Sequence, residues 1–348
     1  MRTPGAGKAK RVTRADVARL AGVSTATVSY VLNASQKVPE RTAKAVWDAV
    51  RRLDYRPNLI ARSLATNETK QLAIVLYNMA NPINADLILG FEGEAIRNGY
   101  FVNICTGNRN LDDYFDNFAS RRIDGLFIDA LPSRYHVEKV TGLVDAGIKV
   151  VTFGNFGIDP RLVSRIETDY PDVMHQAVAH LVELGHRDIA YVSGLSRDHT
   201  LDRRIAGFRR AVRELTGSRS PRIVAPSRNT MTNIEDGTRL TARLLESGAR
   251  FTALVATNDL MAIGAMHALA AAGLRVPRDV SVVGIDGTSV AELCTPPLTS
   301  VATDHEEVGR LAFLLLHADL LHGEKDSRLN RARLVVRDST APAPPAAR

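Results

Sequence analysis

The spacing of apolar residues changes at Gln71, and this change constrains the fold more than any other feature of the chain. Before it, apolar residues recur every three to four positions, which is typical of short amphipathic helices. After it, apolar runs such as LAIVLY alternate with amphipathic stretches of helical length. This alternation predicts parallel sheets with helices on both faces. About ten such runs exceed one compact sheet, so we expect a two-lobed α/β body.

The expected elements of the body follow from these runs. Strands are expected at 72–77, 100–106, 124–130, 149–154, 188–194, 222–226, 253–258, 280–286, 298–304 and 331–338. Helices are expected at 85–98, 111–121, 171–184, 201–216, 234–247, 260–272 and 306–321. We expect lobe 1 to contain residues 71–168 and 298–321, and lobe 2 residues 169–297 and 322–338. The Pro-rich end, 339–348, is expected to be disordered.

Residues 12–57 predict a small all-α domain that follows a basic tail, 1–11. Thr13 and Asp16 form a capping box at the start of the first helix, and Gly22 ends it. Ser24 caps a second helix that reaches Asn33, and a third helix begins at Pro39. The inward positions at helical spacing are Val17, Ala18, Leu20, Ala21, Val28, Val31, Leu32, Ala43, Val46, Trp47, Val50 and Leu53. We expect Trp47, the single tryptophan, to anchor this core.

Charge is concentrated at the N-terminus. Residues 1–66 hold 13 Lys and Arg against four acidic residues, whereas the remainder is slightly acidic. This asymmetry favours a polyanionic partner for the N-terminal domain. Cys105 and Cys294 lack a nearby second cysteine, so no disulfide framework is expected and a reducing compartment fits. Neither a secretory signal nor an apolar segment of bilayer length is present, which favours a cytoplasmic protein without a membrane partner.

Enzyme classes find no support in the motifs. The nine histidines are scattered, and we find no Walker loop, no GxGxxG after a strand and no GxSxG elbow. We therefore expect no catalytic residue, no metal site and no cofactor.

The chain resembles the lactose-repressor family of bacterial transcription regulators. DVARLAGVSTATVSYVLN matches its helix-turn-helix signature, and YRPNLIARSLA at 55–65 matches its hinge signature. HLVELGHRDIAYVSG, RRIAGF, ALVATNDLMAIGAMHAL, VPRDVSVVGID and PPLTSV match segments of its sensor core. The resemblance covers about residues 12–338 and implies a homodimer, a core like that of periplasmic binding proteins, and an effector between two lobes.

The second helix is expected to enter the major groove of double-stranded DNA. Its outward face carries Thr25, Ala26, Ser29 and Tyr30. The resemblance implies that Thr25, Ala26 and Tyr30 read base edges, although the best-known relatives have arginine where this chain has Tyr30. A further set has the donors or the charge to contact phosphates: Thr13, Ser24, Asn33, Lys37, Arg41, Thr42 and Tyr55.

Residues 58–66 are expected to form a hinge helix that orders only when it is packed against something. By resemblance, Leu64 is wedged into a minor-groove step beside its copy from the partner, which kinks the duplex. Asn58, Ala61 and Arg62 complete the set expected at the minor groove.

The effector is expected where polar residues follow strands, because the carboxyl ends of parallel strands form ligand crevices. These residues are Asn81, Asn155, Asn258, Asp259 and Asp286, with Arg204 at a helix start. The resemblance implies that Arg204, Asn258 and Asp286 hydrogen-bond the effector. A sugar or sugar derivative is favoured, while a nucleobase or another metabolite stays open.

These observations predict a repressor whose affinity for a palindromic operator is controlled by a small molecule, as inducer or co-repressor. Two other hypotheses stay open. One is a small-molecule receptor with a vestigial DNA domain, and the other is a global regulator that needs a protein co-effector.

Overall fold

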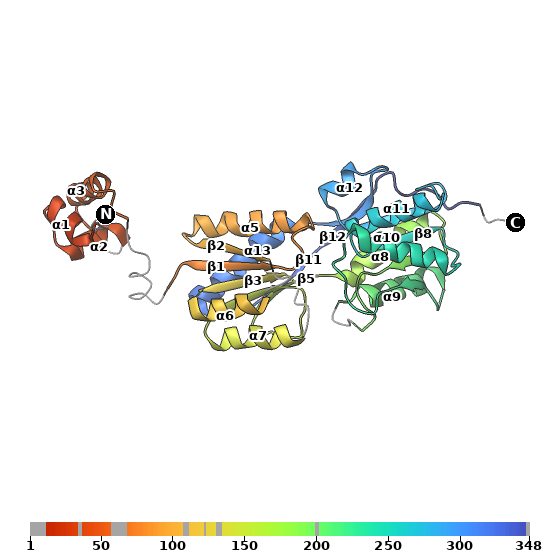
Figure 1. The fold of residues 1–348 in the computed structure, drawn as a ribbon, viewed down its shortest axis with the longest axis horizontal. Helices are drawn as coiled ribbons and strands as arrows, with labels where there is room; N and C mark the ends of the chain where they lie inside the picture. The colour runs from red at the N-terminus through yellow and green to blue at the C-terminus, as the bar shows by residue number, and fades with distance from the viewer. Residues whose placement is uncertain are drawn as a thin grey trace, which may run out of the picture. The chain divides into compact units, whose positions relative to one another are not determined.

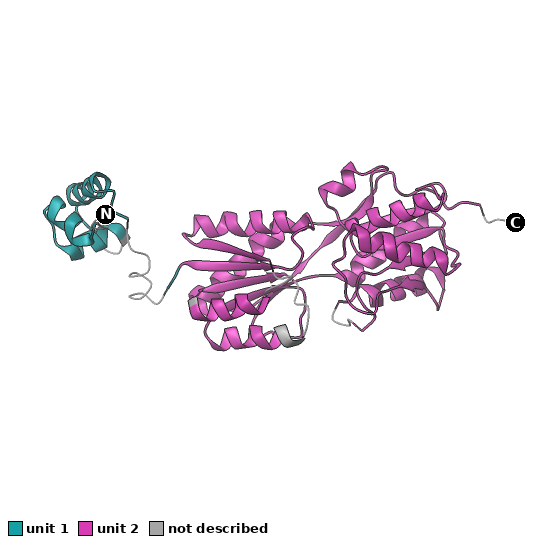
Figure 2. Ribbon diagram, in the orientation of Figure 1, with its two compact units in different colours: residues 1–69 teal, residues 70–348 magenta. Residues whose placement is uncertain are grey.

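The structure is a computed structural model that describes residues 12–33, 37–56, 68–106, 111–121, 123–129, 134–198 and 202–345. The chain divides into two compact units, residues 1–69 and 70–348 (Figure 2). The larger unit contains two six-stranded sheets, which define its two lobes. The expected combination of an all-α N-terminal domain and a two-lobed α/β core is confirmed.

The smaller unit contains three helices, α1 (Arg14–Ala21), α2 (Thr25–Asn33) and α3 (Glu40–Arg52). The predicted capping box is present: the Asp16 backbone N–H donates to the Thr13 hydroxyl, and the Thr13 backbone N–H donates to the Asp16 carboxylate at 3.0 Å. Gly22 ends α1 with φ 66°, a conformation that costs glycine little. The core of this unit consists of Val17, Ala18, Val28, Val46, Ala49 and Tyr55.

Two apolar residues expected in this core are exposed. Trp47 is 42% exposed, because the buried side of α3 is formed by Val46 and Ala49, and each helical step turns a side chain by about 100°. Leu20 is also 42% exposed. It lies about 200° around the helix from the buried Ala18. The prediction that Trp47 anchors the core was therefore wrong.

The first sheet of the larger unit is parallel, with strand order β11-β5-β4-β3-β1-β2. Its strands are β1 (Gln71–Leu76), β2 (Phe101–Thr106), β3 (Gly125–Asp129), β4 (Lys149–Phe153), β5 (Ser164–Thr168) and β11 (Ser327–Asn330). The accompanying helices are α5 (Ile83–Arg97), α6 (Leu111–Arg121), α7 (Arg134–Asp145) and α13 (His305–His322).

The two faces of this sheet bury alternate residues, as the pleat of a strand requires. Leu72, Ile74 and Leu76 of β1 pack with residues of α5 and α13, while Ala73 and Val75 pack with residues of α6 and α7. Figure 1 shows α6 and α7 on one side of the sheet, away from α5. The lobe therefore has helices on both faces.

The second sheet has the order β12-β10-β9-β8-β6-β7 and is parallel except for the antiparallel edge strand β12. Its strands are β6 (Ile189–Val192), β7 (Arg222–Val224), β8 (Ala253–Ala256), β9 (Ser281–Asp286), β10 (Thr299–Thr303) and β12 (Ala332–Val335). Its helices are α8 (Tyr170–Glu183), α9 (Arg204–Thr216), α10 (Ile234–Glu246), α11 (Asp259–Ala271) and α12 (Ser289–Leu293). Helices α8 and α9 cover one face, and α10 and α11 cover the other.

The chain passes between the lobes three times: after β5, after β10 and between β11 and β12. The predicted lobe boundaries need correction at two places. Residues 299–303 belong to lobe 2, because β10 pairs with β9 and β12. Residues 327–330 belong to lobe 1, because β11 pairs with β5.

The end of the chain is also ordered over residues 339–345, contrary to the prediction of a disordered tail. The Ser339 hydroxyl donates to the Val282 carbonyl at 2.6 Å and accepts from the Thr299 backbone N–H at 2.8 Å. Further along, the Ala343 N–H donates to the Leu184 carbonyl at 2.8 Å. These hydrogen bonds attach the segment to lobe 2 despite its proline content.

Candidate functional site

The smaller unit presents the outward face of α2 to solvent. Thr25 and Ala26 are exposed, Tyr30 is 37% exposed and Ser29 is half-buried, while Val28 on the opposite side is fully buried. The Ser24 hydroxyl caps α2 by accepting from the Thr27 N–H at 3.0 Å. The four predicted base-reading residues therefore lie on one face of a helix that is free to meet another surface.

The predicted phosphate contacts differ in exposure. Thr13, Ser24, Lys37 and Arg41 are exposed, and Thr42 is half-buried. Tyr55 is a core residue with 8% of its surface exposed, so its ring is a packing residue and not the surface contact that we expected. The side chain of Asn33, the hinge, and Asn58, Ala61, Arg62 and Leu64 within it lie outside the described residues.

The larger unit contains a cavity of about 590 Å³ lined by residues of both lobes. From lobe 1 come residues at the carboxyl ends of strands, among them Asn81, Asp129 and Asn155. From lobe 2 come Asn258 and Asp286 at strand ends and Arg204 at the start of α9. Five of the six predicted effector residues thus line one cleft, in the position that open α/β sheets favour for ligands.

Asp259 is the exception, because it does not line the cavity. Its side chain is fully buried, where its carboxylate accepts from the Thr288 N–H at 2.7 Å and from the Ser300 hydroxyl at 2.6 Å. Through these bonds, Asp259 connects the loop that follows β9 with strand β10, so the role of this side chain is structural. Burial raises the pKa of this carboxyl, and the hydrogen bonds partly offset that effect.

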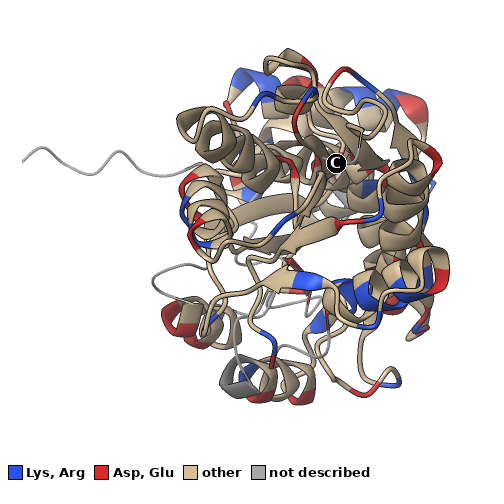
Figure 3. Cartoon of the chain, turned by 90° about the vertical axis from the view of Figure 1, so that its right-hand side faces the viewer, with Lys and Arg blue, Asp and Glu red and all other residues tan. Residues whose placement is uncertain are grey.

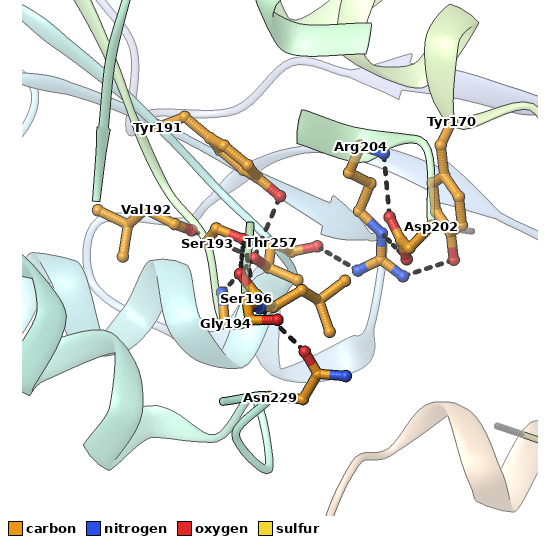
Figure 4. A network of polar contacts seen from close by, with 11 residues as sticks. Tyr170, Tyr191, Val192, Ser193, Gly194, Ser196, Asp202, Arg204, Asn229 and Thr257 are labelled. Carbon is orange, nitrogen blue, oxygen red and sulfur yellow. Dashed lines mark hydrogen bonds and ion pairs between the residues drawn. The ribbon is translucent and has the colours of Figure 1, made fainter. Parts of the chain in front are cut away.

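Arg204 is the most constrained charged side chain of the cleft (Figure 4). Its Nε lies 3.1 Å from an Asp202 carboxylate oxygen. One Nη donates to the Thr257 carbonyl at 3.1 Å, and the other donates to the Tyr170 hydroxyl at 2.7 Å. The guanidinium carbon also lies 4.0 Å from the centroid of the Tyr170 ring. This set holds the guanidinium in one orientation before any ligand arrives.

Asp286 stands at the end of β9 with φ 109°, a conformation that side-chain-bearing residues rarely adopt. Burial and the neighbouring carboxylate of Asp259 raise the pKa of Asp286, while Arg204 and a hydrogen bond from Asn81 lower it. Backbone strain of this kind is concentrated at functional sites.

The two asparagines of the set differ in their contacts. Asn258 caps α11: its side-chain oxygen accepts from the Met261 N–H at 2.9 Å, and its Nδ2 donates to the Thr232 carbonyl at 3.0 Å. Asn155 is half-buried and accepts from the Gly157 N–H at 2.9 Å. Asn258 is therefore largely satisfied by protein groups, and Arg204 and Asp286 dominate the chemistry.

The sequence analysis missed Asp129, Tyr170, Asp202 and His305, all of which line the cleft. Asp129 is the last residue of β3, so the rule that selected Asn81 and Asp286 would have found it. Asp202 lies two residues before Arg204 and binds it locally, whereas Tyr170 contacts Arg204 from a distant part of the chain and carried no local signal. Among the described residues, no cluster of His, Cys, Asp and Glu side chains is arranged to hold a metal ion.

Comparison with known proteins decides the family. Residues 13–58 match the profile of bacterial regulatory proteins of the lacI family, and residues 178–340 match a periplasmic binding protein-like domain. The transcriptional repressor PurR of Proteus mirabilis (strain HI4320) is 32% identical over 343 residues, which cover 94% of this chain and 97% of that protein. The chain belongs to the lacI family of bacterial regulatory proteins.

Solved structures agree with this assignment. The lac repressor dimer bound to operator and the anti-inducer ONPF superposes with a TM-score of 0.82 at 27% identity, covering 95% of this chain and all of that one. A complex of the regulator CelR with cellobiose gives a TM-score of 0.71 at 30% identity, covering 94% of this chain and all of that one.

This lacI-family chain is therefore a DNA-binding transcriptional repressor, and a small-molecule effector controls its DNA binding. Its partners are operator DNA, the effector and a second copy of itself. Within the described ranges, no helix has the length and apolar character needed to cross a bilayer.

Proposed function

We propose that α2 enters the major groove and reads the operator through Thr25, Ala26, Ser29 and Tyr30. The support is their shared outward face beside the buried Val28. Tyr30 offers one hydroxyl and an apolar ring, whereas arginine would bind guanine through two hydrogen bonds. We therefore expect a half-site that favours contacts with thymine methyl groups over a guanine contact at this position.

Phosphate contacts from Thr13, Ser24, Lys37, Arg41 and Thr42 would then set the position of α2 on the duplex without reading sequence. The hinge with Asn58, Ala61, Arg62 and Leu64 would bind the minor groove, where an apolar wedge kinks the duplex. This second contact rests on the match of YRPNLIARSLA alone. Such a protein acts in the cytoplasm, where its operator is.

The effector that we propose is a hydroxyl-rich small molecule, a sugar or sugar derivative, bound in the cleft through Arg204, Asp286, Asn81, Asn155 and Asn258. The preorganised Arg204 beside Asp286 carries this proposal. A guanidinium and a carboxylate bind hydroxyl groups by charge-assisted hydrogen bonds. The cavity of about 590 Å³ has the size of an ordinary small-molecule site. The cellobiose complex of the 30% identical CelR points the same way.

Control of DNA binding then follows from linkage. The cleft lies between two lobes that the chain connects by three crossings, so a ligand that contacts both lobes favours one relative position of them. If the ligand changes the affinity for operator DNA by some factor, operator DNA must change the affinity for the ligand by the same factor.

Selection of duplexes from a random pool by the pure full-length protein tests the DNA proposal. We expect a palindromic site whose affinity falls with salt and changes when a ligand found by thermal-shift screening is added. Tyr30→Ala should remove about 1–3 kcal/mol of discrimination between selected and scrambled duplexes. Arg41→Ala should weaken both duplexes alike, because a phosphate contact carries no sequence information. Equal behaviour of the two variants would contradict the roles given to them.

A further inference from the structure

The inner part of the cleft has more acidic than basic side chains. Asp129 of lobe 1 and Asp286 and Asp202 of lobe 2 line it together with Arg204 as the balancing cation. Asp129 and Asp286 come from different lobes and line the same cavity, so a ligand that fills it can contact both carboxyls. The remaining basic lining residues, Arg203 and Arg228, are exposed at the rim, where water screens their charge.

Arg204 forms an ion pair with only one of the three acidic side chains, Asp202, among the described residues. Its Nε is paired with Asp202, and two further N–H groups donate to Thr257 and Tyr170. The Asp129 carboxyl forms no hydrogen bond or ion pair with any of the described residues, and burial raises its pKa to about 7. His305 adds no positive charge, because burial lowers its pKa to about 4.

Besides the Nε of Arg204, which faces Asp202 as an ion pair without a hydrogen bond, two further lining groups lack hydrogen-bond partners within the described chain. The Oδ1 of Asn84, a residue with only 2% of its surface exposed, has no hydrogen-bond donor within the described chain, while its Nδ2 donates to the Asn78 carbonyl. The Nδ1 of His305, 6% exposed, is likewise without a partner there. Two carboxyls and a buried amide oxygen together offer acceptors to a ligand that donates hydrogen bonds, and a cationic ligand would favour the ionised form of both carboxyls.

We propose that the effector is a polyhydroxylated amine, such as an amino sugar, whose ammonium group binds between Asp129 and Asp286. This inference rests on the proposed function of the cleft as an effector site, and it narrows the candidate effectors to cationic molecules. An ammonium group supplies three donors and one positive charge, which match the surplus of acceptors. Anionic effectors, such as sugar phosphates, are disfavoured by the same charges.

The experiment compares hexosamines with their neutral parent sugars on the full-length protein at pH 6.5. The pairs are D-glucosamine with D-glucose, D-galactosamine with D-galactose, and D-mannosamine with D-mannose, measured by thermal shift and calorimetry. We expect at least one amine to bind at least about tenfold more tightly than its neutral partner, as hydrogen bonds between charged groups allow. Asp129→Asn should remove most of that difference while changing the affinity of the neutral sugar by less than about twofold.

Asp116→Asn is the matched control, an exposed acid on α6 of the same lobe, and it should leave the preference for amines intact. A neutral sugar that binds best and is unaffected by Asp129→Asn would overturn this inference and leave the proposed function standing. Binding by no member of the panel would overturn it as well. The proposed function itself fails only if no metabolite alters operator binding.

Discussion

Single residues of the cleft show how a buried charge is prepared for a ligand. Arg204 is held by an acid, a carbonyl, a hydroxyl and an aromatic ring, so little reorganisation remains when a ligand binds. Lysine in its place would keep the charge but lose the planar arrangement of donors.

Arg204→Lys should therefore weaken effector binding by about 10- to 100-fold, the loss expected for hydrogen bonds that involve charged groups. Calorimetry with the effector found by screening measures this loss, and operator binding without effector reports whether the variant is folded. Lysine is chosen because alanine would leave the half-buried Asp202 without its cationic partner. Unchanged effector affinity in a folded variant would remove Arg204 from the ligand site.

The success of sequence reasoning also varied residue by residue. Polar residues after apolar strands were predictable, because the end of a parallel strand fixes where a side chain lies. The prediction that Asp259 binds the effector was wrong, because residues that follow a strand can also anchor buried loops. Its hydrogen-bond partners, Thr288 and Ser300, come from distant parts of the chain. The prediction that Trp47 anchors the core was wrong because the apolar stripe of α3 is narrow. A hydrophobic residue that lies beside this stripe stays outside the core.

At the scale of elements, long apolar or strongly periodic segments were predictable, whereas the strands β5 and β11 were not. β11 has the sequence SRLN, with three exposed residues at the edge of the first sheet, and β5 alternates buried with half-buried positions. Neither contains the apolar run that marks β1 or β8. Their places depend on pairing between residues that are far apart in sequence, as β11 with β5 illustrates.

The crossing of α5 and α13 depends on glycine. A Cβ atom at Gly90 would collide with the backbone carbonyl of Glu306, and a Cβ at Gly309 would collide with that of Leu87. Gly90→Ala should lower the free energy of unfolding of the core by about 1–3 kcal/mol, the usual cost of overpacking. Urea unfolding followed by circular dichroism measures the change.

Gly93→Ala on the same helix is the control, because its Cβ would meet only the end of the flexible Arg97 side chain at 3.7 Å. Alanine there should be neutral or stabilising by up to about 1 kcal/mol, owing to its higher helix propensity. Equal losses at both positions would show that helix propensity, and not the close crossing, decides the effect.

The ordered C-terminal segment offers a second test at this scale. Ser339→Ala removes a hydroxyl that donates to Val282 and accepts from Thr299. Because the Thr299 N–H is buried and loses its partner, we expect a loss of about 1–3 kcal/mol in the stability of the core. Thermal unfolding measures it, and the exposed Ser220→Ala serves as the control. A loss that is no greater than that of Ser220→Ala would mean that this contact does not stabilise lobe 2.

The whole molecule combines a basic head with a body of nearly balanced charge, which Figure 3 shows as interspersed basic and acidic segments. Inside the body, however, the buried carboxyls of the cleft make stability depend on pH. Burial raises the pKa of Asp129 from 3.8 to about 7, and it also raises the pKa of Asp286.

The folded protein therefore holds protons on these groups that the unfolded chain releases. Their contribution to stability is full below pH 3.8 and is lost as pH rises through about 7 and above. The lowered pKa values of His186 and His305 have the opposite effect, but only below about pH 6.5. The ligand-free core should therefore lose thermal stability between pH 6.5 and 8.5.

Differential scanning calorimetry across this range measures the loss. Asp129→Asn should flatten the profile, because asparagine does not titrate. A midpoint temperature that stays constant or rises over the same range in the unmodified protein would contradict the assignment of protons to these carboxyls.

The three crossings between the lobes also have a consequence for biosynthesis. Lobe 1 needs α13 and β11, which lie near the end of the chain, so a ribosome must translate almost the whole message before this lobe can close. In a prematurely terminated product, the DNA-reading head would be intact, but Phe91 of α5 and Phe127 of β3 would lack the cover that Phe313 provides. Such exposed aromatic surface favours aggregation and degradation, which would keep repressors that cannot sense an effector from persisting on DNA.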